Sequence, residues 1–94
     1  MEELWNKFIV MDITEDHRLI LINDDVNSFS YIMACLIRFC GYEPGQAEQC
    51  ALIADNVGRC AIKHGSYLDM IEIQVRLSGL NIKTKVENNE SNMH

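Results

Sequence analysis

Leu19-Ile20-Leu21-Ile22-Asn23-Asp24-Asp25-Val26-Asn27-Ser28-Phe29 is the stretch that decides the fold of this chain. Its four leading aliphatic residues have no alternating polar face, so they predict a central strand that is covered by helices on one side and shielded on the other. The Asn and Asp residues that follow end the strand, because short polar side chains compete for backbone hydrogen bonds and favour turns. Asn27 or Ser28 then caps a helix.

Two helices are predicted directly after this stretch. Residues 28–40 repeat apolar side chains at the spacing of an amphipathic helix, which ends at Gly41. Pro44 suits the first turn of a second helix, and Gln46 to Asn56 carries a stripe of small side chains that allows close packing. Gly58 ends this second helix.

The second half of the chain predicts strand, helix and strand. Arg59–Lys63 forms a short strand, and His64-Gly65 makes a turn. Ser66, with Asp69 three residues later, resembles a capping box, so a helix is expected over 68–77 although part of it also alternates like a strand. Gly79 breaks that pattern, and Leu80–Val86 alternates apolar with polar residues as a half-exposed strand does.

The predicted fold class is therefore α+β, with the order β-α-α-β-α-β. Three helices pack on one face of a three-stranded, mainly antiparallel sheet. Residues 17–87 form this core domain. Residues 1–16 are either an N-terminal arm or an extra edge strand, and the polar residues 88–94 are expected to be a disordered tail.

Composition limits the classes of function. The 94 residues, 48% hydrophobic and 23% charged, suit one small domain with a single core. A net charge of −6 argues against nucleic acid and against an anionic membrane surface as partners. There is no leader of basic then apolar residues and no apolar run near the ~20 residues of a membrane span, so we expect a cytoplasmic protein.

Neither metal nor catalytic chemistry is expected. The four cysteines are interpreted as reduced core thiols, and Cys60 with His64 supplies too few ligands for zinc. No nucleophile motif, zinc-protease motif or phosphate-binding loop occurs, so the chain is expected to be no enzyme and to need no cofactor.

The order of these motifs resembles the ClpS adaptor family over roughly residues 17–87. The likeness rests on the apolar strand, Asn23-Asp24-Asp25, the helices and the turn Gly58-Arg59-Cys60-Ala61. It implies an adaptor that recognises substrate proteins by their N-terminal segments, as in the N-end rule, and delivers them to a Clp-family AAA+ unfoldase. A bulky hydrophobic first residue would be recognised together with its free α-amino group.

The resemblance also implies site residues. It places the α-amino group against Asn23, Asp24 and Asp55, the last of which stands where the family has histidine. The first side chain of the substrate would enter a hydrophobic pocket formed by Phe29, Ile32, Ala51, Ala54 and Ile82. The start of the third helix lacks the lysine that the family uses to contact the unfoldase.

The chemistry of amine capture fits these residue types. An N-terminal ammonium has a pKa near ~7.7–8.0 and three donors, so it needs convergent acceptors. A second carboxylate at Asp55 increases both the attraction for a cation and the repulsion from Asp24 in the empty site. Other interpretations stay open here: Asp24 caps a helix, Asp55 is merely solvated, or the chain is a diverged interaction module with another ligand or partner.

Overall fold

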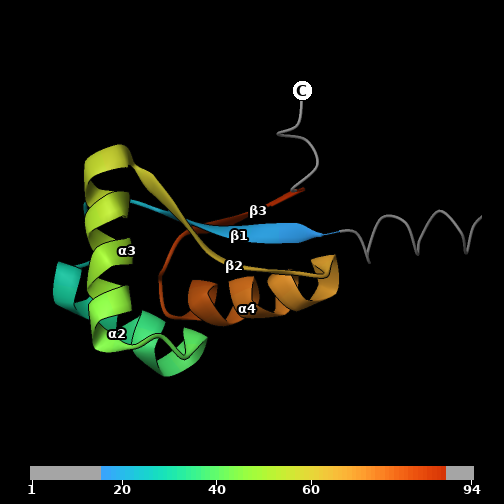
Figure 1. Ribbon diagram of the computed structural model, residues 1–94, viewed down its shortest axis with the longest axis horizontal. Coiled ribbons are helices and arrows are strands. Elements are labelled where there is room, and N and C mark those ends of the chain that lie inside the picture. Colours follow the sequence, from blue (N-terminus) through green and yellow to red (C-terminus); the bar gives the residue numbers. More distant parts are fainter. Residues whose placement is uncertain (1–15, 89–94) are drawn as a thin grey trace, which may run out of the picture.

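The structure, a computed structural model, describes residues 16–88. The predicted N-terminal arm or edge strand, apart from Asp16, and residues 89–94 of the predicted tail lie outside the described residues. The order β-α-α-β-α-β is confirmed (Figure 1). The elements are β1 (His17–Ile22), α2 (Phe29–Cys40), α3 (Pro44–Val57), β2 (Arg59–Gly65), α4 (Tyr67–Gly79) and β3 (Thr84–Asn88).

The sheet has the strand order β2-β1-β3, and β1 runs antiparallel to both neighbours. The prediction of a central strand is confirmed, because Leu19, Ile20 and Leu21 are at most 2% exposed. The helix α4 lies along the sheet and contacts all three strands, whereas α3 contacts β2 and α2 (Figure 1). The fold class is thus α+β, as the sequence indicates.

One hydrophobic core joins the sheet to the three helices. The small residues of α3, Ala47, Ala51 and Ala54, are buried there and allow close packing, as their stripe predicts. Larger side chains from the other elements fill the remaining volume: Leu19, Leu21, Ile32, Leu36, Ile62, Met70, Leu77 and Ile82. The core ends close to the carboxyl end of β1, where the polar cluster begins.

Local signals explain where the helices begin and end. The Ser28 hydroxyl accepts a hydrogen bond from the Tyr31 N–H, and the Ser66 hydroxyl accepts one from the Asp69 N–H, each at 3.1 Å. These N-caps satisfy donors that the first turn leaves free. Gly58, with φ of 99°, ends α3 in a conformation that favours glycine.

The last strand differs from its prediction. It covers Thr84–Asn88 rather than Leu80–Val86, and the preceding residues form a turn after α4. The Ile82 N–H donates to the Leu77 carbonyl at 2.9 Å, and Asn81 has φ of 65°. Leu80 and Ile82 alternate with polar residues because both point toward the core from a turn. Gly79 belongs to α4, and β2 continues through the predicted turn to Gly65.

A pair of glycine substitutions tests the role of Gly58. We expect Gly58→Ala to lower the free energy of unfolding by ~1–2 kcal/mol, because an L-residue is strained at this φ. Gly45→Ala in α3 is the control, since an added Cβ meets no atom within 4 Å at either position but only Gly58 has a positive φ. The control should leave stability unchanged or raise it by up to ~1 kcal/mol. Urea unfolding measures both, and equal losses would contradict the assignment to backbone strain.

Candidate functional site

The end of β1 is held on two sides by backbone hydrogen bonds. The Ile22 N–H donates to the Lys83 carbonyl, and the Asn23 N–H donates to the Gly58 carbonyl, both at 3.0 Å. Asn23 therefore lies between the corner that joins α3 to β2 and the turn that leads into β3. These two hydrogen bonds fix the position of the backbone where the loop from Asn23 to Ser28 begins.

Asp24 organises this loop. Its Oδ1 accepts hydrogen bonds from the N–H groups of Val26 (2.9 Å) and Asn27 (2.8 Å), and its Oδ2 accepts one from Asn27 Nδ2 (3.0 Å). These bonds, the one from the Asn27 N–H above all, lower the pKa of Asp24 although partial burial opposes them. Asp24 is thus an ionised turn residue, and the cap of α2 is Ser28.

The turn after α4 is tied to the same loop. Asn27 Nδ2 also donates to the Asn81 carbonyl at 2.7 Å, and the Tyr31 hydroxyl donates to the Leu80 carbonyl at 2.7 Å. Two side chains from the β1–α2 region thus satisfy carbonyl groups that a turn would otherwise leave to water. This pairing fixes the position of Ile82 relative to Asp24.

A cavity of about 300 Å³ lies between this loop and the turn. Its lining consists of Asp24, Val26, Ser78, Asn81, Ile82 and Lys83. A neighbouring hollow of about 260 Å³ shares Ser78, Ile82 and Lys83 and extends toward Gln74. The cavity brings together one carboxylate and one apolar residue that the sequence assigns to the site, Asp24 and Ile82.

Asp55 lies exposed in the last turn of α3, and Asn23 is half-buried. The hydrogen bond from Asn23 to Gly58 brings the C-terminal end of α3 against the end of β1. That end carries no basic residue in its last turn, so its negative dipole and Asp55 act in the same direction. Within residues 16–88, no group of three His, Cys, Asp or Glu side chains is placed to hold a metal ion.

The five predicted pocket residues divide into two groups. Ile32, Ala51, Ala54 and Ile82 are buried in the core cluster, whereas Phe29 is 38% exposed at the start of α2. The four buried residues belong to one hydrophobic core, and of the four only Ile82 lines the cavity beside Asp24.

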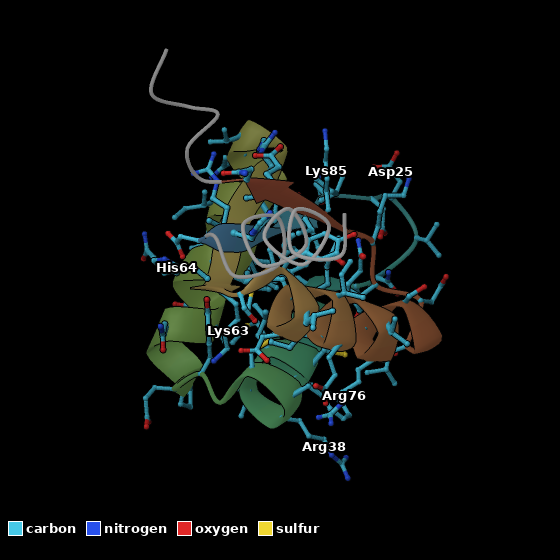
Figure 2. All side chains as sticks on the ribbon, turned by 90° about the vertical axis from the view of Figure 1, so that its right-hand side faces the viewer. Asp25, Arg38, Lys63, His64, Arg76 and Lys85 are labelled. Carbon is cyan, nitrogen blue, oxygen red and sulfur yellow. The ribbon has the colours of Figure 1, made fainter. Side chains whose placement is uncertain are left out.

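Two features of the site had no clear signal in the sequence. Asn27, expected at most as a helix cap, bridges two segments that are 54 residues apart. Lys83 lines the cavity and its positive charge helps to lower the pKa of Asp24. Asp25, which belongs to the same sequence motif as Asp24, is exposed and projects outward from the loop (Figure 2), and no described residue hydrogen-bonds or ion-pairs with it.

Comparison with known proteins identifies the family. Residues 12–86 match the model of the ATP-dependent Clp protease adaptor protein ClpS. The chain belongs to the ClpS family. Its members are adaptors of the ATP-dependent Clp protease. No match was found among curated proteins.

A solved structure shares the fold. It is Agrobacterium tumefaciens ClpS2 bound to L-phenylalaninamide, with a TM-score of 0.76 and 11% sequence identity. The match covers 79% of this chain and 96% of that one. Among the residues that the structure describes, no helix is long and apolar enough to cross a membrane.

Asp24 makes a testable contribution to acid stability. Its pKa is lower in the folded protein than in the unfolded chain, so its contribution is present above ~pH 4 and is lost as the pH falls through the folded-state pKa. We expect Asp24→Asn to lower the free energy of unfolding at pH 6 and to reduce its further fall between pH 5 and pH 3. Glu87, whose pKa is also lowered, should contribute to the acid sensitivity that remains.

The matched control is Asp25→Asn, which removes the neighbouring carboxylate from the same loop. Asp25 accepts no hydrogen bond from the described residues, so this variant should keep the wild-type dependence on pH. Urea unfolding at several pH values measures both variants. An equal effect of the two substitutions would show that loop charge, rather than the Asp24 hydrogen bonds, carries the contribution.

Proposed function

We propose that this protein is a cytoplasmic adaptor that binds the free N-terminus of substrate proteins with a bulky hydrophobic first residue and delivers them to an ATP-dependent Clp chaperone-protease. The observation that carries the proposal is the cavity of about 300 Å³ that places the Asp24 carboxylate beside Val26 and Ile82. An ammonium next to an apolar side chain is the chemistry of an N-terminal residue.

The Asp24 carboxylate retains capacity for a ligand donor. A carboxylate offers about four lone-pair positions, and the hydrogen bonds within the loop use three of them. The remaining position is on Oδ2. The lowered pKa of Asp24 keeps its carboxylate ionised at neutral pH. A hydrogen bond from an ammonium to Oδ2 is therefore charge-assisted and stronger than one between neutral groups.

The surroundings also favour a cation. Asp25 and Asp55 are exposed carboxylates in the loop and in the last turn of α3. Arg59, the basic residue next to this corner, forms an ion pair with Glu87 at 2.7 Å and is thereby directed to that carboxylate. In our proposal Asn23 and Asp55 complete the amine site with Asp24, and Phe29, Ile32, Ala51, Ala54 and Ile82 accommodate the first side chain.

The comparison with ClpS2 supports the chemical class of the ligand. The L-phenylalaninamide bound to ClpS2 has a free amino group and an aromatic side chain. The family supports delivery to a Clp chaperone, because its members are adaptors of the Clp protease. A ligand with a free amine and an apolar side chain thus matches a cavity that combines a carboxylate with apolar residues.

One observation favours a second candidate, a diverged ClpS-like module with a different ligand or partner. Lys83 lines the same cavity as Asp24, and its ammonium repels a ligand amine. A ligand that carries a hydrogen-bond acceptor beside its cationic group would bind Lys83 through the acceptor and Asp24 through the cation. This alternative keeps the fold and the family but changes the group that is recognised.

Calorimetry with a Phe-initiated peptide separates the two candidates. The adaptor proposal predicts binding that acetylation of the peptide amine weakens by at least the ~1–3 kcal/mol of a charge-assisted hydrogen bond. Asp55→Ala should weaken binding of the free peptide within the same range. Glu48→Gln near the other end of α3 also removes one exposed carboxylate and should leave binding unchanged.

Asp55→His completes the design. A neutral imidazole accepts a hydrogen bond without a negative charge, so this variant should retain binding and show a weaker dependence on salt. Equal binding of free and acetylated peptide by the wild type would overturn amine recognition. Binding by Asp55→His but not by the wild type would favour the diverged module.

A further inference from the structure

Two cysteines meet across the corner that follows α3. The Sγ atoms of Cys50 in α3 and Cys60 in β2 lie 3.1 Å apart, and all four cysteines are free thiols. A disulfide has an S–S length of ~2.03–2.05 Å, so the two sulfur atoms need to approach each other by only about 1 Å to be joined. The other two cysteines, Cys35 and Cys40, belong to α2.

The two thiols of this pair differ in their surroundings. Cys50 is 5% exposed in the core, whereas Cys60 is only partly buried at the start of β2. Burial, and then the hydrogen bond with Cys60, raise the pKa of the Cys50 thiol. Cys60 is therefore the thiol that a small oxidant in solution reaches first, and Cys50 is already in place to react with the product.

We propose that Cys50 and Cys60 are a redox site that a hydroperoxide converts into an intramolecular disulfide. The Cys60 thiol loses its proton to water, and the thiolate attacks one peroxide oxygen, so the O–O bond breaks and hydroxide leaves. Cys60 is now a sulfenic acid. The Cys50 sulfur then attacks the Cys60 sulfur, the S–S bond forms, and the sulfenic oxygen leaves as water with the thiol proton.

The balance of the reaction is simple. Two thiols and hydrogen peroxide give one disulfide and two molecules of water, so the thiol pair loses two electrons and the peroxide gains them. A dithiol reductant reverses the reaction by exchange. No metal or cofactor takes part.

The disulfide has a defined structural effect. It joins α3 to β2 around the segment that carries Asp55 and Gly58, and the Gly58 carbonyl is the acceptor for the N–H of Asn23. The bridge restricts the unfolded chain and holds together elements that are already in contact in the fold. We therefore expect the oxidised protein to be more stable than the reduced one. The formation of the disulfide does not depend on the proposed amine site.

The test uses the full chain, reduced and then freed of reductant. A small excess of hydrogen peroxide at neutral pH should lower the intact mass by about 2 Da, which corresponds to loss of two hydrogens. Peptide mapping without reduction should find Cys50 linked to Cys60. The melting temperature should rise by roughly 5 °C or more and return after treatment with dithiothreitol, because a small domain shifts by several degrees for each kcal/mol.

Variants identify the order of the steps. In Cys50→Ser the sulfenic acid at Cys60 has no partner, so dimedone should label it after peroxide treatment. Cys60→Ser should show neither the disulfide nor the label, and Cys35→Ser is the matched control that should form the bridge as the wild type does. Peptide mapping of the oxidised wild-type protein tests the disulfide even where a cysteine variant fails to fold. A bridge through Cys35 or Cys40, a disulfide-linked dimer as the main product, or no loss of mass would overturn the proposal.

Discussion

The pairing of β1 along both of its edges is the constraint on which the rest of the structure depends. A strand as apolar as Leu19-Ile20-Leu21 would be a template for aggregation if one edge stayed open. Here β2 and β3 satisfy both edges in antiparallel register, with His17 opposite Gly65 on one side and Asn88 on the other. The pairing brings residues from the two ends of the described chain together, and it fixes the point at which the polar loop begins.

Charges reinforce this register across the sheet. The Glu87 carboxylate lies 2.7 Å from Arg59, 3.3 Å from Arg18 and 3.8 Å from Lys85, so it connects all three strands. Its hydrogen bond from Arg59 is the main reason that the pKa of Glu87 is lowered. The Asp24 carboxylate in the β1–α2 loop has a different cation nearby, because Lys83 lines the same cavity.

Local patterns predicted most of the fold, and non-local contacts account for what they missed. The apolar run of β1, the small residues of α3 and the caps Ser28 and Ser66 each act within a few residues, so their outcome is visible in the sequence.

The predicted start of β3 was wrong, because Leu80 and Ile82 alternate with polar residues in the same way whether they enter the core from a strand or from a turn. The bridge from Asn27 to Asn81 and the position of Lys83 depend on segments far apart in sequence. The family resemblance, rather than periodicity, supplied Asp55 and the pocket residues, and the helical interpretation of 68–77 also drew on it.

The corner at Gly58 connects the fold, the proposed site and the thiol pair. Its N–H closes α3 on the Ala54 carbonyl at 2.8 Å, and its carbonyl holds Asn23 at the end of β1. Asp55 lies three residues before it, and Cys50 and Cys60 flank it from α3 and β2.

A disulfide bond between Cys50 and Cys60 would therefore restrict the same short segment that positions Asp55. A ligand that binds Asp55 as it stands in this fold loses less conformational entropy when the segment is restrained, whereas one that requires the helix end to move is disfavoured. Oxidation would then change ligand affinity without any change in the groups that contact the ligand.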